Sequence, residues 1–364
     1  MTAPRLPEVS GALAAGQREG LAPGIAAVVV RRGEVLHAEA LGQARLVPTP
    51  RPLGDGDLFD LASLTKLYTA TVAARLVAAG RLELDAPASR WLPGFGGDKA
   101  AITPRHLLAH ASGLPAWRPY WEALQAGANV EALLAAEPLE APPGARAVYS
   151  DLGFLALQLV LERAGGAPLD RLVADEVAAP LGLRDTSFLP AADPAAQARR
   201  ATRSFAATRL APSRGRVLEG EVDDDNAWAL GGVAGHAGLF AGAAEVAAFG
   251  EAWRAALDGD GRLLPPELAR VFARRDAAPG SARALGWDTP SGPETTLGRR
   301  LGRGPRGAVG HLGWTGTSLW LDLDAGLACA LLTNHCHPGG AERARIHALR
   351  RAFHDAVGAA LQLG

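Results

Sequence analysis

Segments with strand character occur near the two ends of this chain, and the long stretch between them is helical in character. Residues 24–31 are apolar and rich in β-branched side chains, and residues 35–42 follow after an Arg-Gly turn, which predicts an antiparallel hairpin. Residues 318–323 and 327–333 predict a second hairpin across a three-residue turn. The pattern favours one sheet assembled from both termini, with a helical insertion packed beside it.

The middle of the chain is rich in Ala and Leu and is interrupted by prolines. Leu64, Leu67 and Val72 recur at helical intervals, so a helix that starts near Ser63 is predicted to be buried and to end by Gly80. Residues 191–225 are the least regular and are predicted to form a loop. Further helices are predicted over residues 104–111, 151–164, 169–179, 243–257 and about 340–361.

Composition excludes several classes of function. The chain has 364 residues and a net charge of −1, which gives no general attraction to nucleic acid or to an anionic membrane. No apolar run approaches the length of a membrane span, and residues 1–7 lack the pattern of a secretion signal, so we expect a cytoplasmic protein. The two cysteines, Cys329 and Cys336, fit a reducing compartment and provide no disulfide framework.

Lysine is almost absent: there are two, Lys66 and Lys99, beside thirty-five arginines. Arginine stays protonated in proteins, whereas a buried lysine can lose its proton and act as a base. Lys66 lies three residues after Ser63, one helical turn away on the same face, where a desolvated amine could accept the serine proton. A lone Ser-x-x-Lys also occurs by chance on solvated helices, so the motif by itself only suggests a nucleophile and its base.

Two further segments carry candidate chemistry. Tyr149 precedes Ser150 and Asp151 at a natural helix start, and a tyrosine near two cations could move a proton, although it could also pack under the helix cap. The second segment, residues 310–318, contains His311, Gly313 and Trp314 at the edge of the late hairpin. Its glycines would let the backbone approach a ligand and a free N–H bind an oxyanion, or they could simply form a turn.

Taken together and in this order, these segments resemble the three motifs of the serine β-lactamase and penicillin-binding protein superfamily. The branch is similar to class C β-lactamases, D-alanyl-D-alanine carboxypeptidases and family VIII esterases. Residues 63–66 resemble the first motif, residues 149–151 the second, usually Tyr-x-Asn, and residues 311–313 the third, usually Lys-Thr-Gly or His-Thr-Gly. Residues 105–115 and 231–240 also resemble the family, and the likeness extends from about residue 20 to 357.

The resemblance implies a β-lactamase-like α/β fold of the α+β type, in which helices flank an antiparallel sheet formed by both termini. We expect one catalytic domain over residues 1–364. Its sheet part would comprise about residues 1–60 and 241–364, and its mostly helical part about residues 61–240. Ser63 would lie in the cleft between the two parts.

The resemblance also implies roles for single residues. Ser63 would be acylated, Lys66 would orient and deprotonate it, and Tyr149 would pass the proton to the leaving group. The N–H groups of Ser63 and Trp314 would form the oxyanion hole. The residues expected to contact substrate are Asp151, His311, Gly313 and His236, and neither a metal nor a cofactor is expected.

Two departures from the family pattern shape the expected activity. Asp151 replaces an amide and would hold Lys66 as a cation, which leaves the Tyr149 phenolate as an alternative base. Leu312 removes a hydroxyl and His311 replaces a permanent cation, so we expect weak or no β-lactamase activity and a small ester, D-amino acid amide or peptide as substrate. A non-catalytic sensor of peptidoglycan fragments, or an acyltransferase using the same site, remain alternatives.

Other polar clusters are interpreted structurally. His106 and His110 have the spacing of zinc ligands, but Leu107 stands where the expected glutamate would be, so His110 is predicted to support the following turn. The His335-Cys336-His337 cluster is interpreted as a strand end in preference to a metal site. Residues 223–226 are predicted to form a solvated loop. His236 could bind substrate or cap the helix that starts at residue 243.

Overall fold

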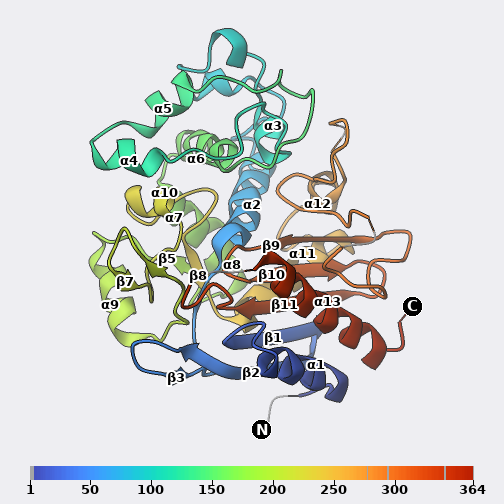
Figure 1. The fold of residues 1–364 in the computed structure, drawn as a ribbon. Coiled ribbons are helices and arrows are strands. Elements are labelled where there is room, and N and C mark those ends of the chain that lie inside the picture. The colour runs from blue at the N-terminus through green and yellow to red at the C-terminus, as the bar shows by residue number, and fades with distance from the viewer. Residues whose placement is uncertain (1–3, 277, 293–294, 340–341, 364) are drawn as a thin grey trace.

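The computed structural model describes residues 4–276, 278–292, 295–339 and 342–363. Its main element is a six-stranded antiparallel sheet in the order β3-β2-β1-β11-β10-β9 (Figure 1). The central pair joins the two ends of the chain, with Ile25 opposite Thr333, as the sequence predicts. The strands are β1 (Gly24–Arg31), β2 (Glu34–Arg45), β3 (Arg51–Pro52), β9 (Ala308–Leu312), β10 (Ser318–Asp322) and β11 (Leu327–Thr333).

Helices cover both faces of this sheet, which explains why its central strands are apolar throughout. Alternate side chains of β1 enter two separate cores: Ile25 and Val29 pack in one, Val28 and Val30 in the other. The first core is closed by α1 (Pro7–Arg18) and α13 (Arg343–Ala360), and the second by α11 (Ala243–Leu257). The predicted fold, an antiparallel sheet from both termini flanked by helices, is confirmed.

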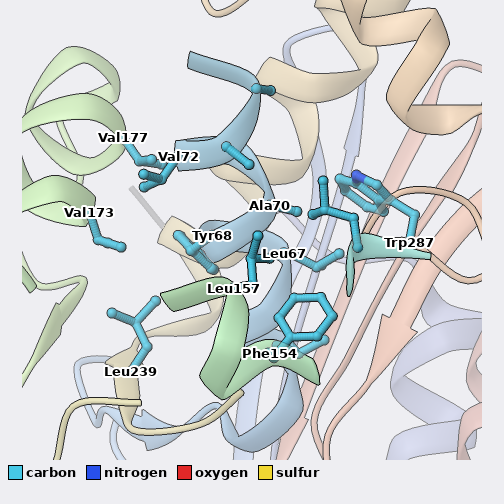
Figure 2. Packing of buried hydrophobic residues seen from close by; sticks show 14 of the residues in the cluster. Leu67, Tyr68, Ala70, Val72, Phe154, Leu157, Val173, Val177, Leu239 and Trp287 are labelled. Carbon is cyan, nitrogen blue, oxygen red and sulfur yellow. The ribbon is translucent and has the colours of Figure 1, made fainter. Parts of the chain in front are cut away.

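Helix α2 (Thr65–Ala78) links the sheet to the helical region, and eleven of its fourteen residues are buried. It packs against α6 (Asp151–Gly165) and α7 (Leu169–Val173), so apolar side chains surround it on several sides (Figure 2). Figure 2 shows Leu67 and Tyr68 of α2 near Leu157 of α6. A helix buried on several sides gives precise support to a residue at its N-terminus, which here is the turn that contains Ser63.

The other elements form the helical region and its connections. Strands β4, β8 and β5 form a three-stranded sheet, and β6 pairs with β7. No helix among the described residues has the length and apolarity needed to cross a membrane. The bounds are β4 (Phe59–Asp60), α3 (Pro104–Leu108), α4 (Tyr120–Gln125), α5 (Val130–Ala136), a π-helix (Ala174–Ala178), α8 (Ala179–Leu181), β5 (Ser187–Phe188), α9 (Pro194–Thr202), β6 (Leu210–Ala211), β7 (Arg216–Val217), α10 (Asp225–Ala229), β8 (Leu239–Ala241) and α12 (Pro266–Ala273).

Several predicted boundaries were wrong. The segment 191–225 is not all loop, because Asp193 caps the start of α9 and Pro194 occupies its first turn. The helix predicted to start near Ser63 is confirmed in position, with a 3₁₀ turn, η1 (Ala62–Leu64), leading directly into α2 at Thr65. The helix predicted over 104–111 ends at Leu108, and His110 follows with φ of 57°.

The remaining predicted helices agree more closely with the structure. The α11 bounds are those predicted, while the helix over 169–179 is divided among α7, a π-helix and α8. Helix α13 begins at Arg343, and residues 340–341 of the predicted closing helix lie outside the described residues. Helix α1 was not predicted.

Candidate active site

The turn that carries Ser63 is held by hydrogen bonds from a distant segment. The residue before the serine, Ala62, has φ of 47°, a left-handed conformation that is unusual for a non-glycine residue. Thr315 Oγ1 donates to the carbonyl oxygen of Asp60 at 2.8 Å, and Thr317 Oγ1 donates to that of Leu61 at 2.9 Å. These contacts fix the turn after β9 against the turn that contains the serine.

Lys66 is fully buried beneath Ser63 and uses its ammonium group in three contacts. Its Nζ donates to Ser63 Oγ at 3.0 Å, to Asp151 Oδ1 at 2.7 Å and to the carbonyl oxygen of His236 at 3.3 Å. An ammonium has three N–H donors and no acceptor, so these partners account for all of them. The predicted proximity of Asp151 to Lys66 is confirmed.

The charge state of Lys66 follows from these neighbours. Burial acts to lower the pKa of the Lys66 amine, but the opposing effects of Asp151 and Tyr149 outweigh it, and the pKa is raised above its usual value. The lysine is therefore a cation in the free chain. The initial expectation of a lysine with a lowered pKa is not met, and the alternative in which Asp151 holds the cation describes the site.

Asp151 is placed by the start of α6. Ser150 caps this helix by accepting from the N–H of Gly153 at 3.0 Å, and its own N–H donates to Nδ1 of His110 at 3.0 Å. Burial, followed by the charges of Arg283 and Lys66, lowers the pKa of His110 well below its usual value, so its imidazole is neutral. His110 thus has a structural role, as the sequence predicts, but its ring supports the start of α6, whereas the prediction was support of the following turn.

Tyr149 lies between two cations. Lys66 Nζ is 4.7 Å from the centroid of its ring, and Cζ of Arg283 is 4.8 Å from that centroid. Arg283 also forms an ion pair with Asp288. Sequence reasoning did not identify Arg283, because it lies outside every motif and is one of thirty-five arginines. Both cationic groups therefore lie close to the ring of Tyr149.

His311, in β9, is buried and neutral. Burial, then the charges of Lys66 and Arg283, lower the pKa of this imidazole well below its usual value. Its Nδ1 lies 2.9 Å from the carbonyl oxygen of Leu312, so Nδ1 carries the proton and donates it. Nε2 is then an acceptor, and it has no hydrogen-bond partner among the described residues. His311 therefore supplies no cation to the cavity, and its role as a substrate contact stays a prediction.

Gly313 lies where two backbones approach closely. A Cβ at this position would lie 2.0 Å from Thr317 Oγ1 and 2.6 Å from the carbonyl oxygen of Leu61. The Gly313 carbonyl accepts from Arg350 at 2.9 Å, and the same Arg350 nitrogen donates to the carbonyl of Thr317 at 2.7 Å. Glycine therefore lets this turn, with Trp314 beside it, pack directly against the segment before Ser63.

Gly313→Ala is expected to reduce ester hydrolysis at least about tenfold, because the turn must move away from the serine and a shift of about 1 Å costs up to 10²-fold. Steady-state kinetics with a p-nitrophenyl ester measures this effect. Gly11→Ala is the matched control, since a Cβ at Gly11 in α1 meets nothing within 4 Å. Equal activity in the two variants would show that the approach of this turn does not matter for catalysis.

The acidic segment after residue 220 is not a solvated loop, which corrects the sequence interpretation. Asp223 is buried and pairs with Arg209. Asp224 caps α10 and lies 3.0 Å from Nε2 of His236. Burial alone would favour the neutral acid, but His236 outweighs it and lowers the pKa of Asp224 to about 2. The three consecutive aspartates, residues 223–225, gave no sign of these long-range partners in the sequence.

His236 itself is only 1% exposed, and its side chain does not cap α11, whose N-cap is Gly242 without a side-chain bond. It is fixed by Asp224 on one side, and its carbonyl oxygen contacts Lys66 on the other. The fold places His236 at Lys66, and its role as a substrate contact stays a prediction.

The predicted site residues come together at one cavity of about 840 Å³. Lys66 lies just below its floor, in contact with Ser63. Two large aromatic side chains on its wall are solvent-exposed, Trp117 at 46% and Trp314 at 65%. Sequence reasoning missed Trp117, Arg283 and Arg350 as lining residues. The predicted residues that line the cavity are Ser63, Tyr149, Asp151, His236, His311, Gly313 and Trp314.

In the cluster of residues 335–337, the ring of His337 makes hydrogen bonds to the main chain. His337 Nε2 accepts from the N–H of Leu46 at 2.8 Å, and its Nδ1 lies 2.7 Å from the carbonyl oxygen of Thr208. Burial raises the pKa of the Cys336 thiol well above its usual value. Within the described part of the chain, no group of three or more His, Cys, Asp or Glu side chains could hold a metal ion.

Comparisons with known proteins agree with this architecture. The family model described as Beta-lactamase matches residues 9–353. An N-acetylmuramyl-L-alanine amidase of Bacillus subtilis strain 168 is 32% identical over 86% of this chain and 78% of its own length. An Escherichia coli K12 protein, whose name gives D-alanyl-D-alanine carboxypeptidase as a proposed activity, is 29% identical over 86% of this chain and 79% of its own length. The solved structure of EstCE1, a hydrolase with promiscuous acyltransferase activity, superposes with a TM-score of 0.73 at 25% identity, covering 95% and 97% of the two chains.

Proposed function

The chain belongs to the β-lactamase family, and from this premise we propose that it is a serine hydrolase whose Ser63 is acylated by a small ester or amide. The observation that carries the proposal is the contact of 3.0 Å between Ser63 Oγ and Lys66 Nζ at the floor of the cavity. Such a contact between a hydroxyl nucleophile and a cation orients the nucleophile and stabilises its negative charge.

The proposed first half-reaction acylates Ser63. Because Lys66 already donates its three protons, Tyr149 acts in this proposal as a phenolate, whose negative charge Lys66 and Arg283 stabilise. The hydroxyl proton of Ser63 passes to the phenolate oxygen and gives a neutral phenol. Ser63 Oγ attacks the carbonyl carbon, and the N–H groups of Ser63 and Trp314 bind the oxyanion. Tyr149 then gives the proton to the leaving group as the bond to it breaks.

In the second half-reaction water replaces the leaving group. Tyr149 takes a proton from the water as it attacks the acyl carbon, and the proton returns to Ser63 Oγ when the ester bond breaks. No step needs a metal or another cofactor. A route in which Lys66 first loses its proton uses the same atoms, and the Tyr149 variant considered below separates the two routes.

The side chains around the serine favour a small ester or D-amino acid amide over a β-lactam. His311 is neutral and Leu312 has no hydroxyl, so neither supplies a charged donor to a substrate carboxylate. A panel of p-nitrophenyl esters, D-amino acid p-nitroanilides and nitrocefin tests this preference. We expect the largest kcat/KM for an ester and the smallest for nitrocefin. Turnover of nitrocefin above all esters, or of no substrate, would contradict the proposal.

Acyl transfer to an alcohol or amine is the second candidate function. EstCE1 is described as having promiscuous acyltransferase activity, and the exposed Trp117 and Trp314 give an apolar acceptor a surface to bind. Product analysis with an alcohol competing against water distinguishes transfer from hydrolysis. A non-catalytic sensor of peptidoglycan fragments is excluded if ester turnover disappears in both Lys66→Ala and Tyr149→Phe.

A further inference from the structure

Asp60 is a buried carboxylate three residues before Ser63, and no step of the proposed reaction uses it. It ends β4, and its side chain is 2% exposed. Oδ1 accepts from the N–H of Ala62 at 2.8 Å, and Oδ2 accepts from the N–H of Asp223 at 2.6 Å. Its main-chain oxygen accepts from Thr315 Oγ1 at 2.8 Å. Asp60 thus joins the serine turn, the acidic segment and the turn beside Trp314.

The serine turn needs such support because Ala62 has φ of 47°. A non-glycine residue in this region is strained and persists only where surrounding contacts hold it. The bond from the Ala62 N–H to Asp60 Oδ1 is a direct contact of that kind. A change in the Ala62 backbone would shift Ser63, because Ser63 is the next residue.

We propose that Asp60 is a positioning residue for the nucleophile: its carboxylate holds the strained Ala62 turn so that Ser63 Oγ meets Lys66 and faces the cavity. Through Thr315 it also ties this turn to the segment that carries the Trp314 N–H. The proposal rests on the proposed function, in which Ser63 is the nucleophile.

The two N–H donors around Asp60 are matched best by an ionised carboxylate. Both oxygens face N–H donors, whereas an asparagine has one acceptor oxygen and would direct its own N–H₂ group at the other donor. Asp60→Asn therefore changes few atoms and leaves one buried N–H without an acceptor. The change removes the proposed function of Asp60 without creating a cavity.

The proposal also has a consequence for pH. Burial, followed by the charge of Asp223, raises the pKa of Asp60 to about 7. The other charged or titratable groups around it are Asp224, the Cys336 thiol and Arg209, which pairs with Asp223. Protonation places a hydrogen on one of the two oxygens and weakens the N–H bond to it, so ordering of the turn is strongest above about pH 7 and weakens as pH falls through that value.

Asp60→Asn is expected to lower the acylation rate of Ser63 about 10²-fold, which is the loss typical of a displaced reacting group. KM is expected to change by less than about threefold. The burst of p-nitrophenol from p-nitrophenyl acetate, recorded between about pH 5.5 and 9, measures this rate and its acid limb. Asp57→Asn is the matched control, because Asp57 is equally buried and its side chain contacts the Gly54 N–H, at 2.6 Å, and Arg51 in place of the serine turn. The control is expected to keep both the rate and the acid limb.

Ala62→Gly provides a rescue that a merely structural role would not predict. Glycine adopts a positive φ without strain, so Asp60→Asn/Ala62→Gly should regain at least about tenfold of the lost rate. If the single variant folds poorly, the acylation rate of the double variant is compared with that of the native chain. A native acylation rate in Asp60→Asn, or no recovery in the double variant, overturns the positioning role. A native chain that neither hydrolyses p-nitrophenyl acetate nor is acylated at Ser63 would instead overturn the proposed function.

Discussion

Lys66→Arg is expected to lower the rate of Ser63 acylation by about 10³-fold, the contribution typical of a group that governs proton transfer. The site of Lys66 is closed, and its Nζ meets Ser63, Asp151 and the carbonyl of His236 as a compact group. A planar guanidinium is larger, directs its donors in a fixed fork and keeps its charge at any working pH. Arginine would therefore preserve the charge and lose both the geometry and any route through a neutral amine.

The chain offers an unusually direct control, since its other lysine is also buried. Lys99 contacts Asp98 at 3.5 Å and lines neither the active cavity nor the serine turn. Lys99→Arg is expected to change the burst rate with a p-nitrophenyl ester by less than about twofold, as is usual for substitutions away from a site. A Lys66→Arg variant with native burst kinetics would show that the amine itself has no special part in the reaction.

Tyr149→Phe is expected to lower kcat by about 10²–10³-fold and to change KM little, because the phenol acts on the proton in the transition state. The loss should be larger for an alkyl ester than for a p-nitrophenyl ester. A good leaving group departs without a proton, whereas an alkoxide needs one from Tyr149. Kinetics with matched esters of the same acyl group measures this difference.

Tyr120→Phe is the control for the loss of a buried hydroxyl. Tyr120 donates its hydroxyl to Glu137 at 2.9 Å, away from the active cavity, so its variant should keep both rates. If Tyr149→Phe loses the same small factor with both esters, the phenol does not protonate the leaving group. Lys66 would then be the remaining candidate for proton transfer.

The parts of the fold that follow from local patterns were predictable. Residues 24–31 and 327–333 are apolar on both faces, and their strands have the predicted bounds, as does α11. Elements that depend on a cap were harder to recognise: α9 starts at an Asp-Pro pair within a stretch without apolar periodicity. Helix α1 was missed although its buried Val9 and Leu13 have helical spacing.

The candidate site also has parts that the sequence predicted and parts that it did not. The three motif segments could be placed together from the sequence because each carries a recognisable spacing. The protonation of Lys66 depended on Asp151, which lies 85 positions further along the chain, and the sequence supported it only through the resemblance. Arg283 and Asp60 had no such signal in the sequence. Each matters because of a neighbour that only the fold brings close, Tyr149 for Arg283 and the Ala62 N–H for Asp60.

The central claim is that Ser63 forms an acyl-enzyme, and one measurement tests it most directly. The native chain and its Ser63→Ala variant are incubated with a fluorophosphonate and examined by intact mass and peptide mapping. We expect one stoichiometric adduct on the native chain, located at Ser63, and none on the variant. An unlabelled native chain, or an adduct of equal extent on Ser63→Ala, would contradict the account.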